Sequence, residues 1–539
     1  MRKLTVLSML LCAACLLKAQ TNGVTTRALS LEECIAIALD HNLTIQITRY
    51  NPMIAGYSLA GSYGDYEPTL SLSGQHDYSL SPGGIDSEGR RFEGTEAEAN
   101  RIGGGLQGFL PWGTTYSLGG SLNDQTVDRT FVTLDPNPAN FTFNTNNVYD
   151  FNTGQPSGYF ITTNYNAIQT RSSFENTAGQ IGALTLRQPL LKNFWIDGIR
   201  LNIFVNKREL AIRESDFRDQ VMTTVTSVEE AYFNLIFSEE SVKVQQKALE
   251  LAERLLSENK RRVQVGALAP LDEKQSESQV ASSRADLLSA QAQRDTQQRV
   301  LKALLSDDYT GEWASVTIAP TDKLLAVAQH YDLQESWRKG LSQGPRLSQS
   351  RLALEQQRQR VRFARNQMYP QLDLVGSYGY SAGGTAQEYS DALGQITDRD
   401  NPFWSFGAQV TIPLGQTSAR NNLKVAKAAQ EQLTLTLKQQ EQQTLIIIEN
   451  AIANAQSSYE RVDATRQFRL YAEAALEAEQ KKLESGKSTS FVVLQLQKDL
   501  TDARSAEIRA LADYNISLAN LALAEGSTFE RRGINLEIQ

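Results

Sequence analysis

Two very long stretches without helix breakers constrain the fold of this chain most. Residues 199–263 contain neither Pro nor Gly, and residues 417–483 are equally uninterrupted. In the first stretch an apolar residue recurs at every seventh position, at Val221, Val228, Leu235, Val242, Leu249, Leu256 and Val263. A step of seven corresponds to 3.5 residues per turn, which winds partner helices around one another. The pattern predicts coiled-coil helices about 100 Å long.

The chain also aligns with itself, which indicates an internal duplication. At a shift of 302 residues, Leu31, Glu33, Leu39, Ile45, Pro68, Leu70, Leu72 and Gly74 fall on Leu333, Glu335, Leu341, Leu347, Pro370, Leu372, Leu374 and Gly376. At a shift of 220, Val228, Val242, Leu256, Val263 and Gly266 fall on Ile448, Val462, Leu476, Leu483 and Gly486. The shift drops because the first copy carries a Gly/Asn/Thr-rich insertion at residues 80–175, predicted as a long inserted loop.

Both copies have the same predicted order of elements: a helix, a strand, a second strand, a very long helix, a Gly-marked turn and a returning helix. Proline ends a preceding helix and presets the first turn of a following one, so it is typical of junctions. We predict strand-helix junctions at Pro68, Pro189, Pro370 and Pro413. The alternative for any one of them is an ordinary loop proline.

The predicted domains follow from this order. A first repeat covers residues 20–308, with a hairpin tip near Gly266, and a linker covers residues 309–330. The second repeat covers residues 331–525, with a tip near Gly486, and residues 526–539 form a C-terminal tail.

The strand candidates alternate between apolar and polar residues. Four strands are predicted from Leu70 and Leu72, from Leu184 and Leu186, from Leu372 and Leu374, and from Phe406, Ala408, Val410 and Ile412. A hairpin at residues 101–123, around Pro111, Trp112 and Gly113, would add two more. Such alternation is typical of outer-membrane strands, although a single strand of this kind fits a soluble sandwich equally well. A closed membrane barrel needs about eight strands, so three chains, with about 12 or 18 strands, could close one.

The N-terminal residues have the pattern of an export signal. Arg2 and Lys3 precede an apolar run from Leu4 to Leu17, which predicts a signal peptide at residues 1–19. Lipidation of Cys15 is the alternative. After the leader no run of 18 apolar residues occurs, so any membrane segment is expected to consist of β-strands. Cys34 is predicted to be a buried small hydrophobe.

Composition and motifs argue against several functions. A net charge of -8, from 53 basic and 61 acidic residues, does not suit nucleic-acid binding. His41, His76 and His330 are scattered, so no His-based metal site is predicted. Residues 103–108 fit G-x-G-x-x-G, but Phe-Leu-Pro follows instead of a helix. We find no catalytic constellation and predict neither an enzyme nor a bound cofactor.

The ordered motifs resemble those of TolC-type outer-membrane efflux proteins over about residues 29–525. The resemblance rests on Leu31-Glu32-Glu33, on Pro-x-Leu-x-Leu at Pro68–Leu72 and Pro370–Leu374, on Gln188-Pro189-Leu190 and Ile412-Pro413-Leu414, and on Gly266 and Gly486. It implies an α+β membrane protein: a trimeric β-barrel in the outer membrane, continued by a long α-helical coiled-coil barrel in the periplasm. It also implies the exit duct of a tripartite efflux or type I secretion system, served by a periplasmic adaptor and an inner-membrane transporter of the RND, ABC or a similar class.

The resemblance also suggests functional residues. The hairpin tips, with Gly266, Leu268, Gly486 and Ser488, would contact the adaptor. In the family, acidic residues six and nine positions after the second tip glycine narrow the periplasmic entrance. Here those positions are Val492 and Gln495, whereas Asp272 lies six residues after Gly266. The expected aperture, formed by Asp272, Val492 and Gln495, is therefore more apolar.

Two functions from different classes remain open on the sequence. One is a passive trimeric exit duct driven by an inner-membrane partner. The other is a non-pore periplasmic coiled-coil scaffold. The transported cargo leaves no recognisable pattern in the sequence.

Overall fold

The computed structural model describes residues 25–86, 89–140, 142–164, 166–266, 268–383, 386 and 388–535. The chain divides into two compact units. The helical unit comprises Met1–Ser58, Val205–Gln357 and Ala428–Gln539, and the sheet unit comprises Leu59–Phe204 and Arg358–Lys427. The predicted signal peptide, residues 1–19, and Cys15 within it lie outside the described residues.

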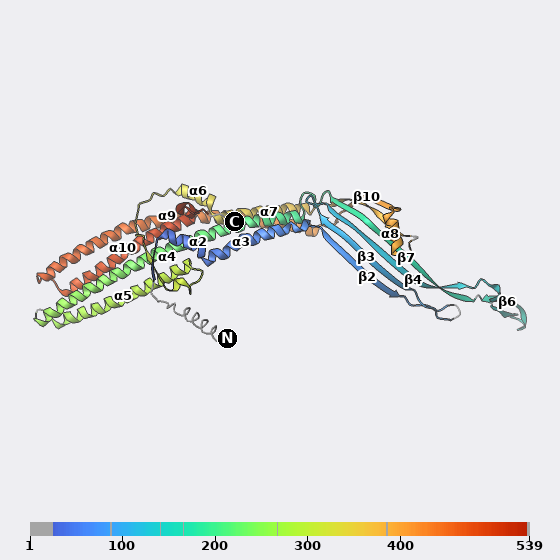
Figure 1. The fold of residues 1–539 in the computed structure, drawn as a ribbon, viewed down its shortest axis with the longest axis horizontal. Helices are drawn as coiled ribbons and strands as arrows, with labels where there is room; N and C mark the ends of the chain where they lie inside the picture. Colours follow the sequence, from blue (N-terminus) through green and yellow to red (C-terminus); the bar gives the residue numbers. More distant parts are fainter. Residues whose placement is uncertain are drawn as a thin grey trace, which may run out of the picture. The chain divides into compact units, whose positions relative to one another are not determined.

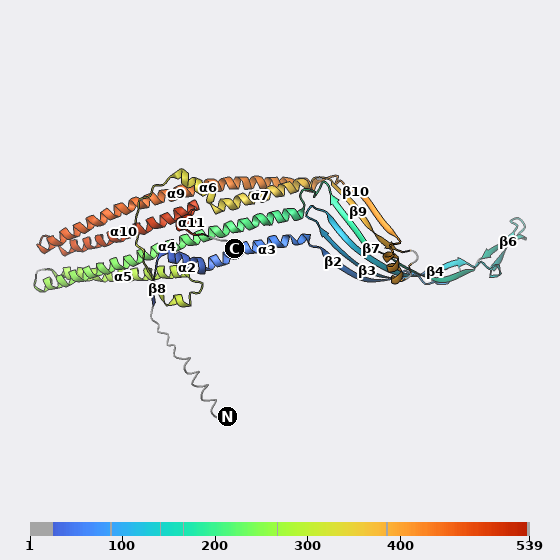
Figure 2. The same ribbon diagram turned by 45° about the horizontal axis from the view of Figure 1, so that its top comes forward.

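Two hairpins of long helices dominate the helical unit. Helix α4 (Gly198–Gln264) has 67 residues and helix α9 (Thr417–Glu484) has 68, which confirms the two predicted long helices. Each is followed by a returning helix of 36 residues, α5 (Pro270–Leu305) or α10 (Ser490–Glu525). The two hairpins lie side by side in Figures 1 and 2, and apolar side chains of α4, α9 and α10 pack together between them.

The shorter helices repeat the duplication. Helices α2 (Leu31–His41) and α3 (Leu43–Ser62) are separated by Asn42 alone, and α6 (Leu333–Gln343) and α7 (Pro345–Asn366) by Gly344 alone, 302 residues later. The preceding N-caps also correspond. The Ser30 hydroxyl accepts the backbone N–H of Glu33 at 3.3 Å, and Asp332 accepts that of Gln334 at 2.9 Å. Different side chains therefore fulfil the same capping role in each repeat.

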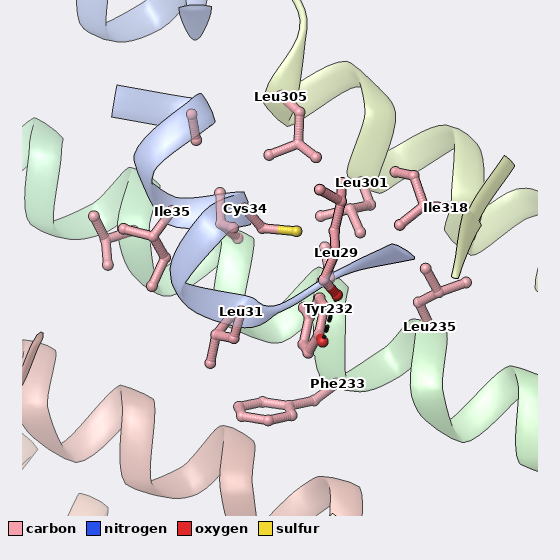
Figure 3. Packing of buried hydrophobic residues seen from close by; sticks show 14 of the residues in the cluster. Leu29, Leu31, Cys34, Ile35, Tyr232, Phe233, Leu235, Leu301, Leu305 and Ile318 are labelled. Carbon is pink, nitrogen blue, oxygen red and sulfur yellow. Dashed lines mark hydrogen bonds between the residues drawn. The ribbon is translucent and has the colours of Figure 1, made fainter. Parts of the chain in front are cut away.

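The main core of the helical unit surrounds the middle of α4. Val221, Val228 and Leu235 are fully buried, whereas the later heptad positions are only half-buried. Figure 3 shows Leu29, Leu31 and Cys34 packed against side chains from α4 and α5. As predicted, Cys34 is buried, and burial raises its pKa to about 12. Among the described helices, none is both long and apolar enough to span a bilayer.

The predicted linker, residues 309–330, is not merely a connection. It contains a 3-10 turn (η3, Glu312–Ala314) and strand β8 (Val316–Pro320), which pairs in parallel with β1 (Thr25–Leu29). Just beyond β8, Asp322 accepts the backbone N–H of Leu31 at 2.8 Å. The first residues of the described chain are thereby joined to the segment between the two repeats.

The predicted C-terminal tail contains helix α11 (Thr528–Arg532). Arg532 donates two hydrogen bonds to the carboxylate of Glu229 in α4, at 2.7 and 2.6 Å. The Glu229 side chain is only 1% exposed, so this pair is the main compensation for a buried charge. Burial also lowers the pKa of the neighbouring Arg531.

The sheet unit is built on one antiparallel sheet of six strands in the order β10-β9-β7-β4-β3-β2. The strands are β2 (Thr69–Leu80), β3 (Glu96–Phe109), β4 (Thr115–Leu134), β7 (Ala167–Pro189), β9 (Gln371–Ala382) and β10 (Pro402–Thr411). Strands β5 (Thr142–Tyr149) and β6 (Pro156–Asn164) pair separately between β4 and β7, and Pro138–Asn140 (η2) precedes them. Gly64–Tyr66 (η1) precedes β2, and helix α8 (Tyr389–Thr397) lies between β9 and β10.

The prediction of a long inserted loop at residues 80–175 is wrong. Most of this segment is strand, and the hairpin around Pro111 supplies β3 and β4 to the sheet. Its glycines occupy paired positions, with Gly104 opposite Gly120 and Gly105 opposite Gly119. A Cβ on Gly119 would approach the Gly104 carbonyl oxygen to 2.9 Å, so these glycines permit a close approach of two strands.

We expect Arg532→Met to lower the free energy of unfolding by about 3 kcal/mol, because it leaves the Glu229 carboxylate buried without its main partner. Urea unfolding of the full chain in detergent, followed by circular dichroism, measures this change. Arg254→Met is the control, since Arg254 forms an exposed ion pair with Glu250 and should change stability by less than about 0.5 kcal/mol. Equal effects of the two substitutions would contradict a structural role for the α11 contact.

Candidate functional site

The six-stranded sheet has two chemically opposite faces. Cross-strand pairing places one residue from every strand in a single row on one face: Leu70, Leu106, Leu118, Leu184, Tyr378 and Trp404. The adjacent row points to the other face and consists of Thr69, Gln107, Ser117, Thr185, Ser377 and Ser405. One row is wholly apolar and the next wholly polar, which is the pattern of a sheet between lipid and water.

The apolar row is largely uncovered. Leu70 is 67% exposed, Leu118 is 44% exposed and Trp404 is 77% exposed. Contiguous exposed apolar surface of this kind marks a site of membrane or protein contact. On the polar face, the hydroxyl groups of Ser377 and Ser405 lie 2.7 Å apart and hydrogen-bond to each other.

The strands are staggered as in a tilted sheet. Thr411, the last residue of β10, pairs with Gln371, whereas Thr69, the first residue of β2, shares a row with Ser377. The ends of these outer strands are thus offset by six residues across five strand-to-strand steps. At about 3.3 Å per residue and 4.8 Å between strands, this offset corresponds to a tilt of about 40°. Membrane strands tilt by about 35–45°.

Both outer strands have a free edge. Among the residues that the structure describes, strand β2 pairs only with β3 and β10 only with β9, so each presents unpaired backbone groups along one side. The helices next to these strands in the chain also have exposed apolar side chains. Helix α3, which precedes β2, exposes Leu43, Ile47, Tyr50, Ile54 and Tyr57 at steps of four and three residues. Helix α9, which follows β10, exposes Val425, Leu435 and Ile446.

The four predicted junction prolines lie between strands and helices. Pro68 and Pro370 come immediately before β2 and β9, Pro189 is the last residue of β7, and Pro413 lies between β10 and α9. The first two therefore stand where a helix gives way to a strand, and the other two where a strand gives way to a helix.

The two helical hairpins turn at Gly266 and Gly486. Both residues have positive φ angles, +78° and +70°, which glycine adopts at little cost. Apolar side chains near the tips are exposed: Val265 is 78% exposed, Leu271 is 66% exposed and Phe491 is 60% exposed. Leu268, the remaining predicted tip residue of the first hairpin, is half-buried.

A polar network joins the two hairpins just behind their tips. Asn259 of α4 is fully buried and donates to the Ser276 hydroxyl of α5 at 2.8 Å. The Ser490 hydroxyl of α10 donates to the side-chain Oδ1 of Asn259 at 3.2 Å. At the second tip, Ser488 donates to Glu479 at 2.5 Å. Hydrogen bonds from Lys482 and Ser488 lower the pKa of Glu479.

The predicted aperture residues occupy the first turns of two helices. Asp272 lies in α5 and accepts the backbone N–H of Ala269 at 3.3 Å, so its carboxylate caps the helix. Val492 and Gln495 lie on the exposed side of α10. Gln495 donates to Asp499 at 2.9 Å. Sequence reasoning missed Asp499, although its spacing of four residues from Gln495 would have placed the two on one helix face.

Within the described residues, His, Cys, Asp and Glu side chains form no group of three that could hold a metal ion. The features that distinguish this chain are therefore surfaces: the two faces and two edges of the sheet, and the two hairpin tips.

Comparison with known proteins identifies relatives with the same architecture. The chain is 23% identical over 340 residues to the outer membrane protein TolC of Escherichia coli (strain K12), covering 61% of this chain and 66% of the relative, just under two thirds of its length. Its fold is similar to the crystal structure of the Campylobacter jejuni CmeC outer membrane channel, with a TM-score of 0.62 and 15% identity, covering 92% of this chain and 86% of that one. The open-state Neisseria gonorrhoeae MtrE outer membrane channel gives a TM-score of 0.59 at 16% identity, covering 92% of this chain and 89% of that one.

A family match completes the comparison. Residues 161–306 and 338–527, more than half of the chain, match the family described as "Outer membrane efflux protein". Members of this family are transport conduits rather than enzymes, and the relatives place the chain in the outer membrane with an extension into the periplasm. The chain belongs to the outer membrane efflux protein family.

Proposed function

We propose that three copies of this chain form a passive exit duct through the outer membrane. The observation that carries the proposal is the six-stranded sheet, which has one apolar face, one polar face and two free edges. In lipid, an unpaired edge leaves backbone groups without hydrogen-bond partners, so a spanning sheet must close on itself. Six strands are too few to close, since known membrane barrels start at about eight.

Edge pairing between copies solves this problem. The free edge of β2 in one copy would pair with the free edge of β10 in the next, and three such contacts would close an 18-stranded barrel. Three is the number that the family resemblance implies. Barrels of about 16–18 strands enclose an aqueous channel. The Ser, Thr and Gln side chains of the polar face would line the water, and the Leu, Tyr and Trp side chains of the apolar face would contact lipid.

The same contact would continue into the helices. Because α3 precedes β2 and α9 follows β10, each neighbouring pair of copies would bring an α3 against an α9. The exposed stripe on α3 has the spacing of a coiled-coil seam, and burying its five side chains against a second copy removes a large apolar surface from water. A long α-helical coiled-coil barrel in the periplasm would result.

The hairpin tips would bind a periplasmic adaptor protein. Exposed Val265, Leu271 and Phe491 beside Gly266 and Gly486 offer apolar anchors of the kind that dominate protein interfaces. An inner-membrane transporter of the RND, ABC or a similar class would supply energy and cargo, in a tripartite efflux or type I secretion system. The duct itself would conduct passively.

The lipid-facing role of the apolar face predicts a strong contrast between neighbouring residues of β4. We expect Leu118→Arg to destabilise the membrane-inserted protein by about 2 kcal/mol, because the guanidinium would enter lipid. Ser117→Arg, on the polar face, should have little effect. Urea titration of both variants refolded into phospholipid vesicles measures the difference. Similar stabilities would contradict the assignment of the two faces.

Edge pairing between copies predicts specific cross-links. We expect Ser71→Cys in β2, combined in turn with Ser405→Cys, Gly407→Cys or Gln409→Cys in β10, to give a covalent trimer on oxidation in at least one combination. All four positions lie on the polar face. Denaturing gels detect the product, and Ser71→Cys with Ser117→Cys, in the central strand β4, is the matched control.

Other outcomes would count against the duct. Single chains in every combination would contradict the trimer. A soluble rod that fails to conduct ions in planar bilayers would support the alternative of a periplasmic coiled-coil scaffold without a pore.

We further propose that Asp272, Val492 and Gln495 lie near the closed periplasmic aperture. Shortening a side chain at a constriction widens it, so Val492→Gly and Gln495→Ala should raise the single-channel conductance in planar bilayers. Gln442→Ala, an exposed position far along α9 from the tip, is the control and should leave the conductance unchanged. Unchanged conductance in both test variants would place the aperture elsewhere.

A further inference from the structure

Helix α8 lies on the apolar face of the sheet. Its buried side chains Ala392 and Ile396 pack with Leu122 of β4 and Tyr380 of β9. Leu122 is four residues after Leu118 in the same strand, and so points to the same face. At the start of α8, the Tyr389 hydroxyl donates to the Asn100 carbonyl oxygen of β3 at 3.0 Å. Figures 1 and 2 draw α8 at the end of the sheet where β10 begins.

The chemistry of this face changes beneath α8. In β4, Leu118 and Leu122 are followed on the same face by Asp124, Thr126 and Asp128. In β3, which runs the opposite way, Ile102 gives way to Asn100, Glu98 and Glu96. The apolar surface ends on both strands at the level that α8 covers.

The height of the apolar surface fits a bilayer. Leu372, near the start of β9, and Ala382, which packs in the α8 cluster, are ten residues apart. At about 3.3 Å per residue this is about 33 Å along the strand, or about 25 Å in height at a tilt of about 40°. The apolar band of outer-membrane proteins is about 25 Å tall. Helix α8 therefore stands at the upper limit of the band.

The helix is amphipathic, with its apolar side against the sheet and a mainly polar outward side. Ala392 and Ile396 face the sheet, whereas Ser390, Asp391 and Thr397 are exposed. Leu393, 40% exposed, is the large apolar side chain on the outward side. Because the apolar side of α8 is buried against the sheet, its outward side presents polar groups and Leu393, which suits the headgroup layer better than the acyl chains.

We propose that α8 is a membrane-surface element that lies in the headgroup layer of the outer leaflet and sets the height at which the sheet stops in the bilayer. This inference rests on the proposed function, because it takes the apolar face to contact lipid. A second copy of the chain is a poorer occupant. Helix α8 packs over β9 and the central strands β7 and β4, whereas a neighbouring copy would join at the free edges of β2 and β10.

Depth measurements test the proposal directly. The full chain, with Cys12 and Cys15 of the predicted signal peptide replaced by Ser, is reconstituted into phosphatidylcholine vesicles with a single nitroxide label at Leu393→Cys, Leu118→Cys or Thr126→Cys. Cys34 stays unlabelled because it is fully buried and its pKa is about 12. Accessibility to oxygen and to a water-soluble nickel complex gives the depth of each label. We expect the label at position 393 to report an interfacial depth, between a lipid-buried label at 118 and an aqueous label at 126.

The outcomes separate this proposal from the proposed function. A label at 393 that is as aqueous as the one at 126, or as deep as the one at 118, overturns the role of α8 while the duct stands. A label at 118 that is outside lipid contradicts the duct itself, and with it the role of α8.

A second pair of variants tests whether packing on the sheet holds α8 in place. Ile396→Asp puts a charge into the contact with Leu122 and Tyr380, and should raise the nickel accessibility of the label at 393 to that of the label at 126. Thr397→Asp adds the same charge on the exposed side and should leave the label at 393 at its original depth. If Ile396→Asp does not move the label, the sheet does not fix the position of α8, and the proposal fails.

Discussion

The unpaired backbone groups along β2 and β10 are the constraint on which the rest of this structure depends. Soluble proteins protect edge strands with lysines, internal prolines, bulges or very short strands. Strands β2 and β10 are 12 and 10 residues long and contain no lysine, and their one proline is Pro402 at the start of β10. Edges of this length without such protection are suited to pairing, and the apolar face between them restricts that pairing to a membrane.

The helix before β2 and the helix after β10 both expose apolar side chains, so one contact between copies would satisfy the sheet and the helices together. Within one chain, the helical unit is stabilised by a short strand pair and by a buried ion pair. The ladder of β1 with β8 joins the start of the described chain to the segment between the repeats, and Arg532 anchors α11 to Glu229. These contacts lie within one helical unit, whereas among the described residues both outer strands of the sheet keep a free edge.

The sequence predicts those parts of the molecule that repeat over long distances. The lengths of α4 and α9 are predicted by the long stretches that contain neither Pro nor Gly. The tips at Gly266 and Gly486 are predicted by the duplication, which aligns these two glycines. The sequence leaves open whether the hairpin at residues 101–123 joins the sheet, because Gly104 and Gly105 carry no apolar side chain, although they pair with Gly120 and Gly119 across two strands. Strands β1 and β8 have five residues each and pair with each other although they are far apart in the sequence, so no local pattern predicts them.

The two faces of the sheet can be predicted from the sequence, but the contacts of individual polar side chains cannot. Alternation within a strand identifies which residues share a face, so the apolar and polar rows follow from the sequence. Which hydrogen bond a polar side chain makes depends on the groups that the fold brings near it. Asp272 caps its own helix and Gln495 donates to Asp499, and neither contact follows from counting positions after a tip glycine. Helix α8 escaped notice because its nine residues are too short to show a helical period in the sequence.

The β3–β4 hairpin determines where selection would occur in the proposed duct. Four of the six strands adjoin a helical segment in the chain, but β3 and β4 are joined by a turn in which the Leu110 backbone N–H donates to the Thr114 carbonyl oxygen. This hairpin lies before the segments that match the family. It adds two strands to the sheet and no helix. Barrel diameter grows roughly in proportion to strand number, and the extra strands would take a trimer from 12 to 18. The outer-membrane section of the proposed duct would then be too wide to discriminate among small solutes, so passage would be controlled at the proposed aperture near the hairpin tips.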